Sequence, residues 1–268
     1  MLRLGGFEIL DILKLGGSVI TFKDRVMTPN KEAIRRLSRE IAMAGFHHLV
    51  IVHGGGSYGH PLAKEHGIAQ GFKSTEQFIG FSRTRQAMID LNCMIVGALL
   101  DEGVPAVSLS PSTFISTHEG RLQEYDLRLV RWYLDSGMVP VMYGDAVLDS
   151  ALGFTILSGD QLAVRLAIDL KADTLLFGVD VDGVYTGNPK MAKGIKLIEK
   201  LSLGQVRSMI GIGEATSTDV TGGMLGKIKE AQIAVEFGVG VQMINALVPG
   251  RVFEALKGEP VVGTILTR

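Results

Sequence analysis

Short apolar runs rich in β-branched residues alternate with longer helical patterns along this chain. The runs predict strands over 8–15, 48–53, 106–109, 138–143, 154–157, 174–179, 241–245 and 263–266. The longer patterns predict helices over about 30–44, 75–102, 127–136, 224–237 and one ending at 170, with a hairpin around 118–120. Such alternation is typical of a mostly parallel sheet covered by helices on both faces. The sequence therefore predicts a doubly wound α/β sandwich built on one sheet.

We expect a single domain over residues 1–268, with one functional half over about 1–170 and a second over about 171–268. No flexible linker separates the halves, and 268 residues are enough to bury a large core. With 27 basic and 28 acidic residues, no overall field favours nucleic acid or an anionic membrane. Without an apolar leader or a span-length apolar window, we expect a cytoplasmic protein. The lone cysteine, Cys93, rules out an intramolecular disulfide, and its apolar helical context predicts a buried side chain.

The segment 52–61, VHGGGSYGHP, ends an apolar strand with glycines closed by a histidine. Glycines let backbone N–H groups approach a phosphate closely, and a helix predicted to start near Pro61 would add the positive end of its dipole. His60 would then lie at the rim, where it could hold a second anionic group. The segment therefore predicts an anion cradle with a hydrogen-bonding histidine.

The same segment also matches the dinucleotide fingerprint G-x-G-x-x-G, with Glu76 about twenty residues beyond. In a Rossmann unit that acid lies at the tip of the next strand, whereas Glu76 falls in the first turn of a predicted long helix. This context disfavours dinucleotide binding.

The first strand runs into KLGGS at 14–18, at the strand end where open α/β sheets gather ligands. Lys14 interrupts an apolar strand, which is costly unless its charge meets an anion. Lys23, in a polar stretch shortly after, is a weaker candidate.

The sequence SGD at 158–160 also follows a predicted strand and begins a helix. Asp160 could be a simple helix cap or, beside Lys14, a carboxylate that keeps lysines charged and oriented. We do not expect it to act as a base.

Two further loops fall in the second half. The stretch 178–185, GVDVDGVY, joins a strand to a polar loop in which paired acids could bind Mg²⁺ or loop amides. The stretch 219–227, DVTGGMLGK, places glycines and Lys227 at a helix start, which favours phosphate, but it is not a Walker A loop because Ile228 replaces Ser or Thr. No histidine or cysteine spacing suggests a transition-metal site.

Together, KLGGS, VHGGGSYGHP, SGD, DVDGVY at 180–185 and DVTGGMxGK resemble the amino acid kinase superfamily in type and order. His60, PAVSLSPS at 105–112 and VPVMYGD at 139–145 are similar to the branch of that superfamily that phosphorylates isopentenyl phosphate. The resemblance implies a three-layer αβα sandwich, usually a homodimer, with the acceptor in the N-terminal half and ATP mainly in the C-terminal half.

The resemblance also implies residue roles. Lys14, Lys23, His60 and Asp160 would serve the transfer, and Gly55, His60 and Gly159 would bind the acceptor. The nucleotide would contact Lys14, Gly16, Gly17, Ser18, Gly56, Asp180, Tyr185, Gly223 and Lys227.

The implied reaction uses ATP and Mg²⁺ to phosphorylate a monophosphate monoester, so it needs charge neutralisation and alignment more than a general base. An apolar tail pocket would draw on Phe78, Ile79, Met88 and Ile156. Three alternatives remain open: a kinase acting on a phosphonate such as fosfomycin or on a carboxylate, an NAD-dependent oxidoreductase, and a non-catalytic nucleotide sensor.

Overall fold

The computed structural model describes residues 9–46, 48–187, 194–208 and 222–268. Its strands are β1 (Asp11–Leu15), β2 (Leu49–His53), β3 (Ala106–Ser108), β4 (Ile115–His118), β5 (Arg121–Tyr125), β6 (Val139–Tyr143), β7 (Asp145–Asp149), β8 (Gly153–Leu157), β9 (Thr174–Val179), β10 (Lys200–Ser202), β11 (Gly240–Asn245) and β12 (Gly263–Thr267). Its α-helices are α1 (Gly17–Ile20), α2 (Lys31–Ala44), α3 (Gly56–Glu65), α4 (Gln77–Asp101), α5 (Arg128–Asp135), α6 (Gly159–Leu170), α8 (Gly222–Glu236) and α9 (Arg251–Leu256).

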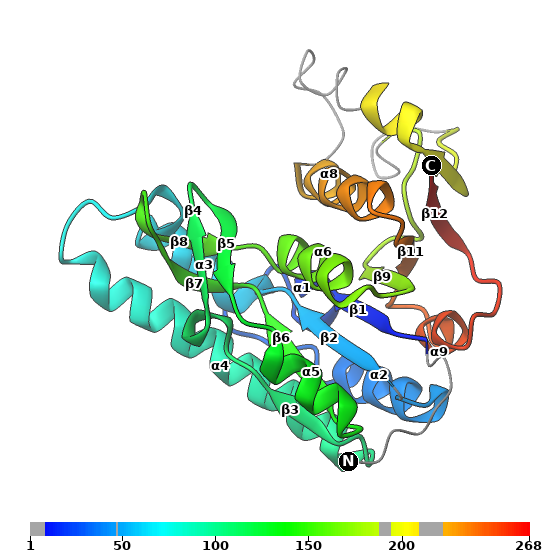
Figure 1. Cartoon of the computed structure of the whole chain (residues 1–268), viewed down its shortest axis with the longest axis horizontal. Coiled ribbons are helices and arrows are strands. Elements are labelled where there is room, and N and C mark those ends of the chain that lie inside the picture. The colour runs from blue at the N-terminus through cyan, green and yellow to red at the C-terminus, as the bar shows by residue number, and fades with distance from the viewer. Residues whose placement is uncertain (1–8, 47, 188–193, 209–221) are drawn as a thin grey trace.

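An eight-stranded sheet in the order β10-β12-β11-β9-β1-β2-β6-β3 runs through the molecule (Figure 1). The strands from β11 to β3 are mutually parallel, and β12 pairs antiparallel with β11. The predicted α/β sandwich with a mostly parallel sheet is confirmed.

Successive side chains of each central strand enter different cores, because side chains alternate across a sheet. Ile12 and Val50 pack in the core that contains α5, α6 and α8 residues, whereas Leu13 and Ile51 pack in the core formed with α1, α2, α4 and α9. Both faces of the sheet are therefore covered, which gives three layers.

A second sheet lies beside the first, so the prediction of one sheet was wrong. It has the order β5-β4-β7-β8, with antiparallel pairs β4–β5 and β7–β8. The predicted hairpin around residues 118–120 is confirmed as β4–β5. The predicted strand 154–157 forms β8 of this sheet. Its antiparallel partner, β7, was not predicted from the sequence.

Two helices differ from prediction at their starts. Helix α3 begins at Gly56, not near Pro61, because contacts with another loop hold its first turn: Ser57 N–H donates to Thr21 Oγ1 at 3.0 Å. Pro61 therefore lies inside the helix. Helix α4 begins at Gln77, whose side chain accepts from Ser74 N–H at 3.2 Å.

Cys93 is exposed, so the prediction of a buried side chain was wrong. The buried stripe of α4 includes Thr84, Met88, Leu91 and Ile95. Cys93 falls outside this spacing of three and four residues and faces away from the core.

Candidate active site

A pocket of about 720 Å³ opens where β1, β2 and β9 end. The segments that follow these strands line it, namely residues 16–18, 54–57 and 179–181, and so does the start of α6. Helices α1, α3 and α6 all begin at this pocket, so their positive dipole ends favour an anionic ligand there. The pocket therefore has the position and the polarity of a phosphate site.

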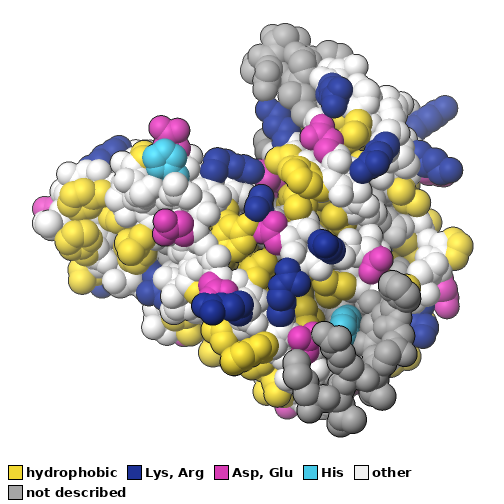
Figure 2. Space-filling model, in the orientation of Figure 1, with side chains coloured by type: hydrophobic (Ala, Val, Ile, Leu, Met, Phe, Trp, Pro, Cys, Tyr) yellow, Lys and Arg dark blue, Asp and Glu magenta, His cyan; other side chains and the backbone are white. Residues whose placement is uncertain are grey.

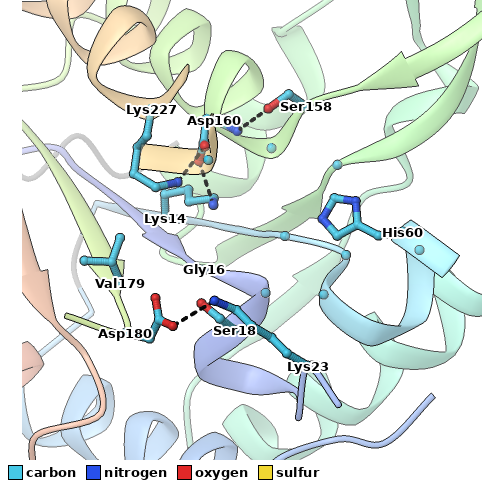
Figure 3. Close-up of a pocket in the computed structure, with 18 of the residues that line it drawn as sticks. Lys14, Gly16, Ser18, Lys23, His60, Ser158, Asp160, Val179, Asp180 and Lys227 are labelled. Atoms are coloured by element: carbon cyan, nitrogen blue, oxygen red, sulfur yellow. Dashed lines mark hydrogen bonds and ion pairs between the residues drawn. The ribbon is translucent and has the colours of Figure 1, made fainter. Parts of the chain in front are cut away.

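Lys14 enters the pocket from the middle of the sheet. It shares the face of β1 with Ile12, and that face is covered by α6 and α8. Its Nζ lies 2.6 Å from Asp160 Oδ1 on α6, and Lys227 Nζ on α8 lies 2.6 Å from Asp160 Oδ2 (Figure 3). One carboxylate thus pairs with two lysines drawn from the two halves of the chain, which is the organising arrangement considered for Asp160.

Burial alone would raise the pKa of Asp160, but the two ammonium groups lower it to about 2, so the carboxylate is ionised at neutral pH. Burial and the neighbouring charge of Lys14 lower the pKa of Lys227 to about 8. The cluster carries one net positive charge when all three groups are ionised. This net positive charge can attract a phosphate group.

The glycines bring two loops into backbone contact beneath the ligand space. A Cβ on Gly17 would lie 2.3 Å from Gly56 N, and a Cβ on Gly56 would lie 2.1 Å from Thr21 Oγ1. Gly56 also has a φ of +48°, which disfavours other residues. The Gly16 N–H donates to Gly178 C=O at 2.8 Å, so this N–H is not available to bind a ligand.

His60 lies across the pocket from the lysine cluster (Figure 3). It is on α3, after the glycines, and its ring is exposed to the pocket. Desolvation by the surrounding protein and the charge of Lys14 lower its pKa. At neutral pH the imidazole is therefore uncharged, with one N–H that can donate to a phosphate oxygen.

Ser18, Lys23 and Asp180 come together in another part of the pocket (Figure 3). Lys23 Nζ lies 2.9 Å from Asp180 Oδ2, and Tyr185 donates through its hydroxyl to Asp182 Oδ2 at 3.1 Å. Burial would raise the pKa of Asp180, but the hydrogen bond and charge of Lys23 lower it. Ser18, Tyr185 and Gly223 also line the pocket. Residues 219–221 of the predicted glycine loop lie outside the described residues.

The pocket also has an apolar part. Its lining includes Ala63, Met88, Ala146 and Ile156. Of the four tail residues expected from sequence, Met88 and Ile156 are therefore in place. Phe78 and Ile79 were wrong: they are 52% and 61% exposed and do not line the pocket.

Sequence reasoning missed Thr84 and Asp145, which also line the pocket. Thr84 lies inside α4, and its hydroxyl donates to Gly80 C=O, so no local pattern marks it. Asp145 follows the end of β6, and its place after a central strand was an available signal. Gly55 and Gly159, by contrast, lie in the lining as expected.

The described residues contain no group of three or more acidic, histidine or cysteine side chains that could hold a metal ion. In the same part of the chain, no helix combines the length and apolar character needed to cross a membrane. Figure 2 shows basic and acidic side chains interspersed over the viewed face, not gathered into one basic patch.

The chain matches the amino acid kinase family over residues 11–245. It belongs to that family, and it is a kinase. Within the family, the chain is similar to several enzymes named isopentenyl phosphate kinase. The enzyme of that name from Methanothermobacter thermautotrophicus is 46% identical over 96% of this chain and 98% of its own.

Solved structures agree with the sequence relatives. A crystal structure of an isopentenyl phosphate kinase superposes with a TM-score of 0.85 at 42% identity, covering 96% of this chain and 100% of that one. An isopentenyl phosphate kinase substrate complex gives a TM-score of 0.78 at 30% identity, covering 96% and 100%. Membership of a kinase family, together with Glu76 at the start of α4, sets aside the oxidoreductase alternative.

Proposed function

We propose that this protein transfers the terminal phosphoryl group of ATP to isopentenyl phosphate, giving isopentenyl diphosphate and ADP. The observation that carries the proposal is a single pocket that holds the lysine cluster, His60 across from it, and the apolar side chains of Met88 and Ile156. A phosphate held near His60 would extend its alkyl tail toward Met88 and Ile156, while its free oxygens would face Lys14. The names of the relatives support the same acceptor.

The reaction forms a bond between an acceptor phosphate oxygen and the γ-phosphorus, and it breaks the bond from that phosphorus to the β-phosphate bridging oxygen. The acceptor oxygen is already a nucleophile at neutral pH, so no general base is needed. Catalysis then consists of alignment and offset of negative charge. Lys14 and Lys227 supply positive charge, and Asp160 keeps both ammonium groups in place.

The donor is ATP, whose phosphates would lie between the Gly17–Gly56 contact and the start of α8. Lys23, Asp180 and Tyr185, which line the pocket, would contact the nucleotide, as would Ser18 and Gly223. This assigns residues 1–170 mainly to the acceptor and residues 171–268 mainly to ATP.

Mg²⁺ is expected to accompany ATP. Two acids of the pocket are engaged, because Asp160 holds two lysines and Asp180 pairs with Lys23. The described side chains do not form a protein cage for the ion. Bound Mg²⁺, held chiefly by phosphate oxygens, would reduce the charge repulsion between the two substrates.

The proposal also covers the pathway, the compartment and the oligomeric state. Isopentenyl diphosphate formation would serve isoprenoid biosynthesis by an archaeal-type mevalonate pathway, in the cytoplasm, by a homodimer. The oligomeric state is checked by sedimentation velocity at micromolar concentration, where a mass near 29 kDa would contradict the dimer.

Phosphorus NMR of a mixture of ATP, Mg²⁺ and isopentenyl phosphate tests the reaction. The expected result is a new pair of coupled diphosphate signals and equimolar ADP. Fosfomycin and a carboxylate acceptor run in parallel. Turnover of either, without turnover of isopentenyl phosphate, would assign the protein to another acceptor.

The role of His60 is tested with two variants. His60→Ala should abolish turnover of isopentenyl phosphate while leaving ATP affinity in place, and His60→Asn, which retains an N–H donor, should recover part of it. Wild-type activity in His60→Ala would remove His60 from the site.

A further inference from the structure

His53 is a buried histidine at the end of β2, and the phosphoryl transfer described above does not use it. Its side chain is 0% exposed, and it is absent from the pocket lining. Its ring stacks on Tyr143 with 5.3 Å between the ring centroids. A fully buried titratable group directly before the glycine segment needs a structural reason.

The two ring nitrogens of His53 have different partners. Nδ1 lies 3.1 Å from the carbonyl oxygen of Gly54, and Nε2 lies 3.1 Å from Nδ2 of the buried Asn92. A carbonyl can only accept, so Nδ1 carries the proton, and the Asn92 amide donates to the lone pair of Nε2. The Ser108 hydroxyl in turn donates to Asn92 Oδ1, which fixes the orientation of the amide. Burial and the charge of Lys14 lower the pKa of His53 to about 4, consistent with this neutral form.

The hydrogen bond to Gly54 determines the direction of the next donor. In a trans peptide the C=O and the following N–H point in opposite directions. Because the Gly54 C=O is turned toward the His53 ring, the Gly55 N–H is turned the other way, on the side of the peptide remote from that ring. The Gly54 N–H donates to Leu15 C=O at 2.9 Å, so the residue is fixed on both sides. Glycines at 54 and 55 would otherwise leave this peptide free to rotate.

We propose that His53 is a positioning residue: its Nδ1–H holds the Gly54–Gly55 peptide so that the Gly55 N–H faces the acceptor phosphate, and Asn92 fixes the required tautomer. This inference rests on the proposed function for the identity of the acceptor. The ligand chemistry it predicts is a phosphate monoester bound by a backbone N–H together with Lys14 and His60. The effect is expected on acceptor affinity and not on ATP affinity.

Two substitutions at His53 separate a positioning role from a packing role. His53→Asn places an N–H donor near the position of Nδ1, whereas His53→Gln places its amide near Nε2 and loses the bond to Gly54. We expect His53→Gln to raise the KM for isopentenyl phosphate about tenfold, with the KM for ATP changed by less than about twofold. His53→Asn should recover most of the affinity. His118→Gln, at an exposed histidine outside the pocket lining, is the matched control.

The tautomer gives a readout that does not depend on activity. Nitrogen-15 NMR of the wild-type protein at pH 7 should show a protonated Nδ1 and an unprotonated Nε2 for His53. Asn92→Leu, which removes the donor to Nε2, should weaken this preference and raise the acceptor KM in the same direction. A proton on Nε2 in the wild type would overturn the inference, as would a folded His53→Gln protein with wild-type KM for both substrates.

Failure of the proposed function has a different signature. If the wild type forms no diphosphate from isopentenyl phosphate, calorimetry with inorganic phosphate replaces KM as the measure of acceptor-site affinity. A loss of phosphate affinity in His53→Gln with recovery in His53→Asn would still support the positioning role. Equal phosphate affinity in all three proteins would refute it.

Discussion

Replacing Asp160 by asparagine tests the charge arrangement at the centre of the pocket. The side chain is 16% exposed, and it pairs at 2.6 Å with two lysines that are 5% and 12% exposed. Without the carboxylate, two largely buried ammonium groups face each other with no counter-charge. Removing one member of a buried ion pair costs about 3–5 kcal/mol, and the water-accessible pocket places this site at the lower end of that range.

The assay is thermal unfolding with and without ATP and Mg²⁺. For a chain of this size, a loss of about 3 kcal/mol corresponds to a decrease in Tm of roughly 6 °C. Because nucleotide phosphates would supply the missing negative charge, ATP should raise the Tm of Asp160→Asn by more than it raises that of the wild type. The phosphoryl transfer rate should fall, since neither lysine is then held in position.

The control is Asp126→Asn, which removes a carboxylate from an exposed pair with Arg128 and should leave the Tm unchanged. If Asp160→Asn unfolds within about 2 °C of the wild type and shows the same ATP-induced shift, the two lysines do not depend on Asp160. The electrostatic account of the pocket would then be wrong.

Three further outcomes follow from the site. Because the pKa of Lys227 is lowered to about 8, its positive charge is present below that pH and lost above it. The value of kcat/KM for ATP should therefore decline above about pH 8. Lys227→Arg should move this decline to higher pH. The pKa of His53 is lowered to about 4 in the folded protein, below its ordinary 6.5, so between these values only the unfolded chain binds the proton. The contribution of His53 to the free energy of unfolding should therefore fall by about 3 kcal/mol as the pH drops from 6.5 to 4. Chemical denaturation of the wild type and of His53→Asn at both pH values measures this difference. Gly56→Ala would bring a Cβ to 2.1 Å from Thr21 Oγ1 at a φ of +48°, so it should lose activity and several degrees of Tm, while Gly97→Ala, where a Cβ meets nothing within 4 Å, should not.

The layers and the strand ends could be predicted because they follow from local patterns. Lys14 interrupts an apolar strand, and the alternation of β1 alone places it on the face shared with Ile12. The glycine segments after β1 and β2 likewise carried their own signal. Glu76 was correctly set aside as a ribose ligand because its place at a helix start was readable from the sequence.

The predictions that were wrong concern features that tertiary contacts determine. Helix α3 extends back to Gly56 because Thr21 and Gly17, far away in sequence, pack against its first turn. Cys93 lies on a helix with apolar residues on more than one side, so periodicity did not identify the buried stripe. Phe78 belongs to the same helix but lies near its exposed start. The pairing of β7 with β8 in a separate sheet also has no local signature.

The contact between Gly17 and Gly56 limits how this pocket can be redesigned. Neither position accepts a side chain, and each is excluded by backbone or side-chain atoms of the other loop, so a substitution at one cannot be compensated by shortening a neighbour. A library intended to change the acceptor should therefore keep both codons invariant. Diversity belongs at Ile156, an apolar lining position that is only partly buried, and not at Met88, whose Sδ would lie 3.1 Å from a Cβ on Gly55 beneath the phosphates.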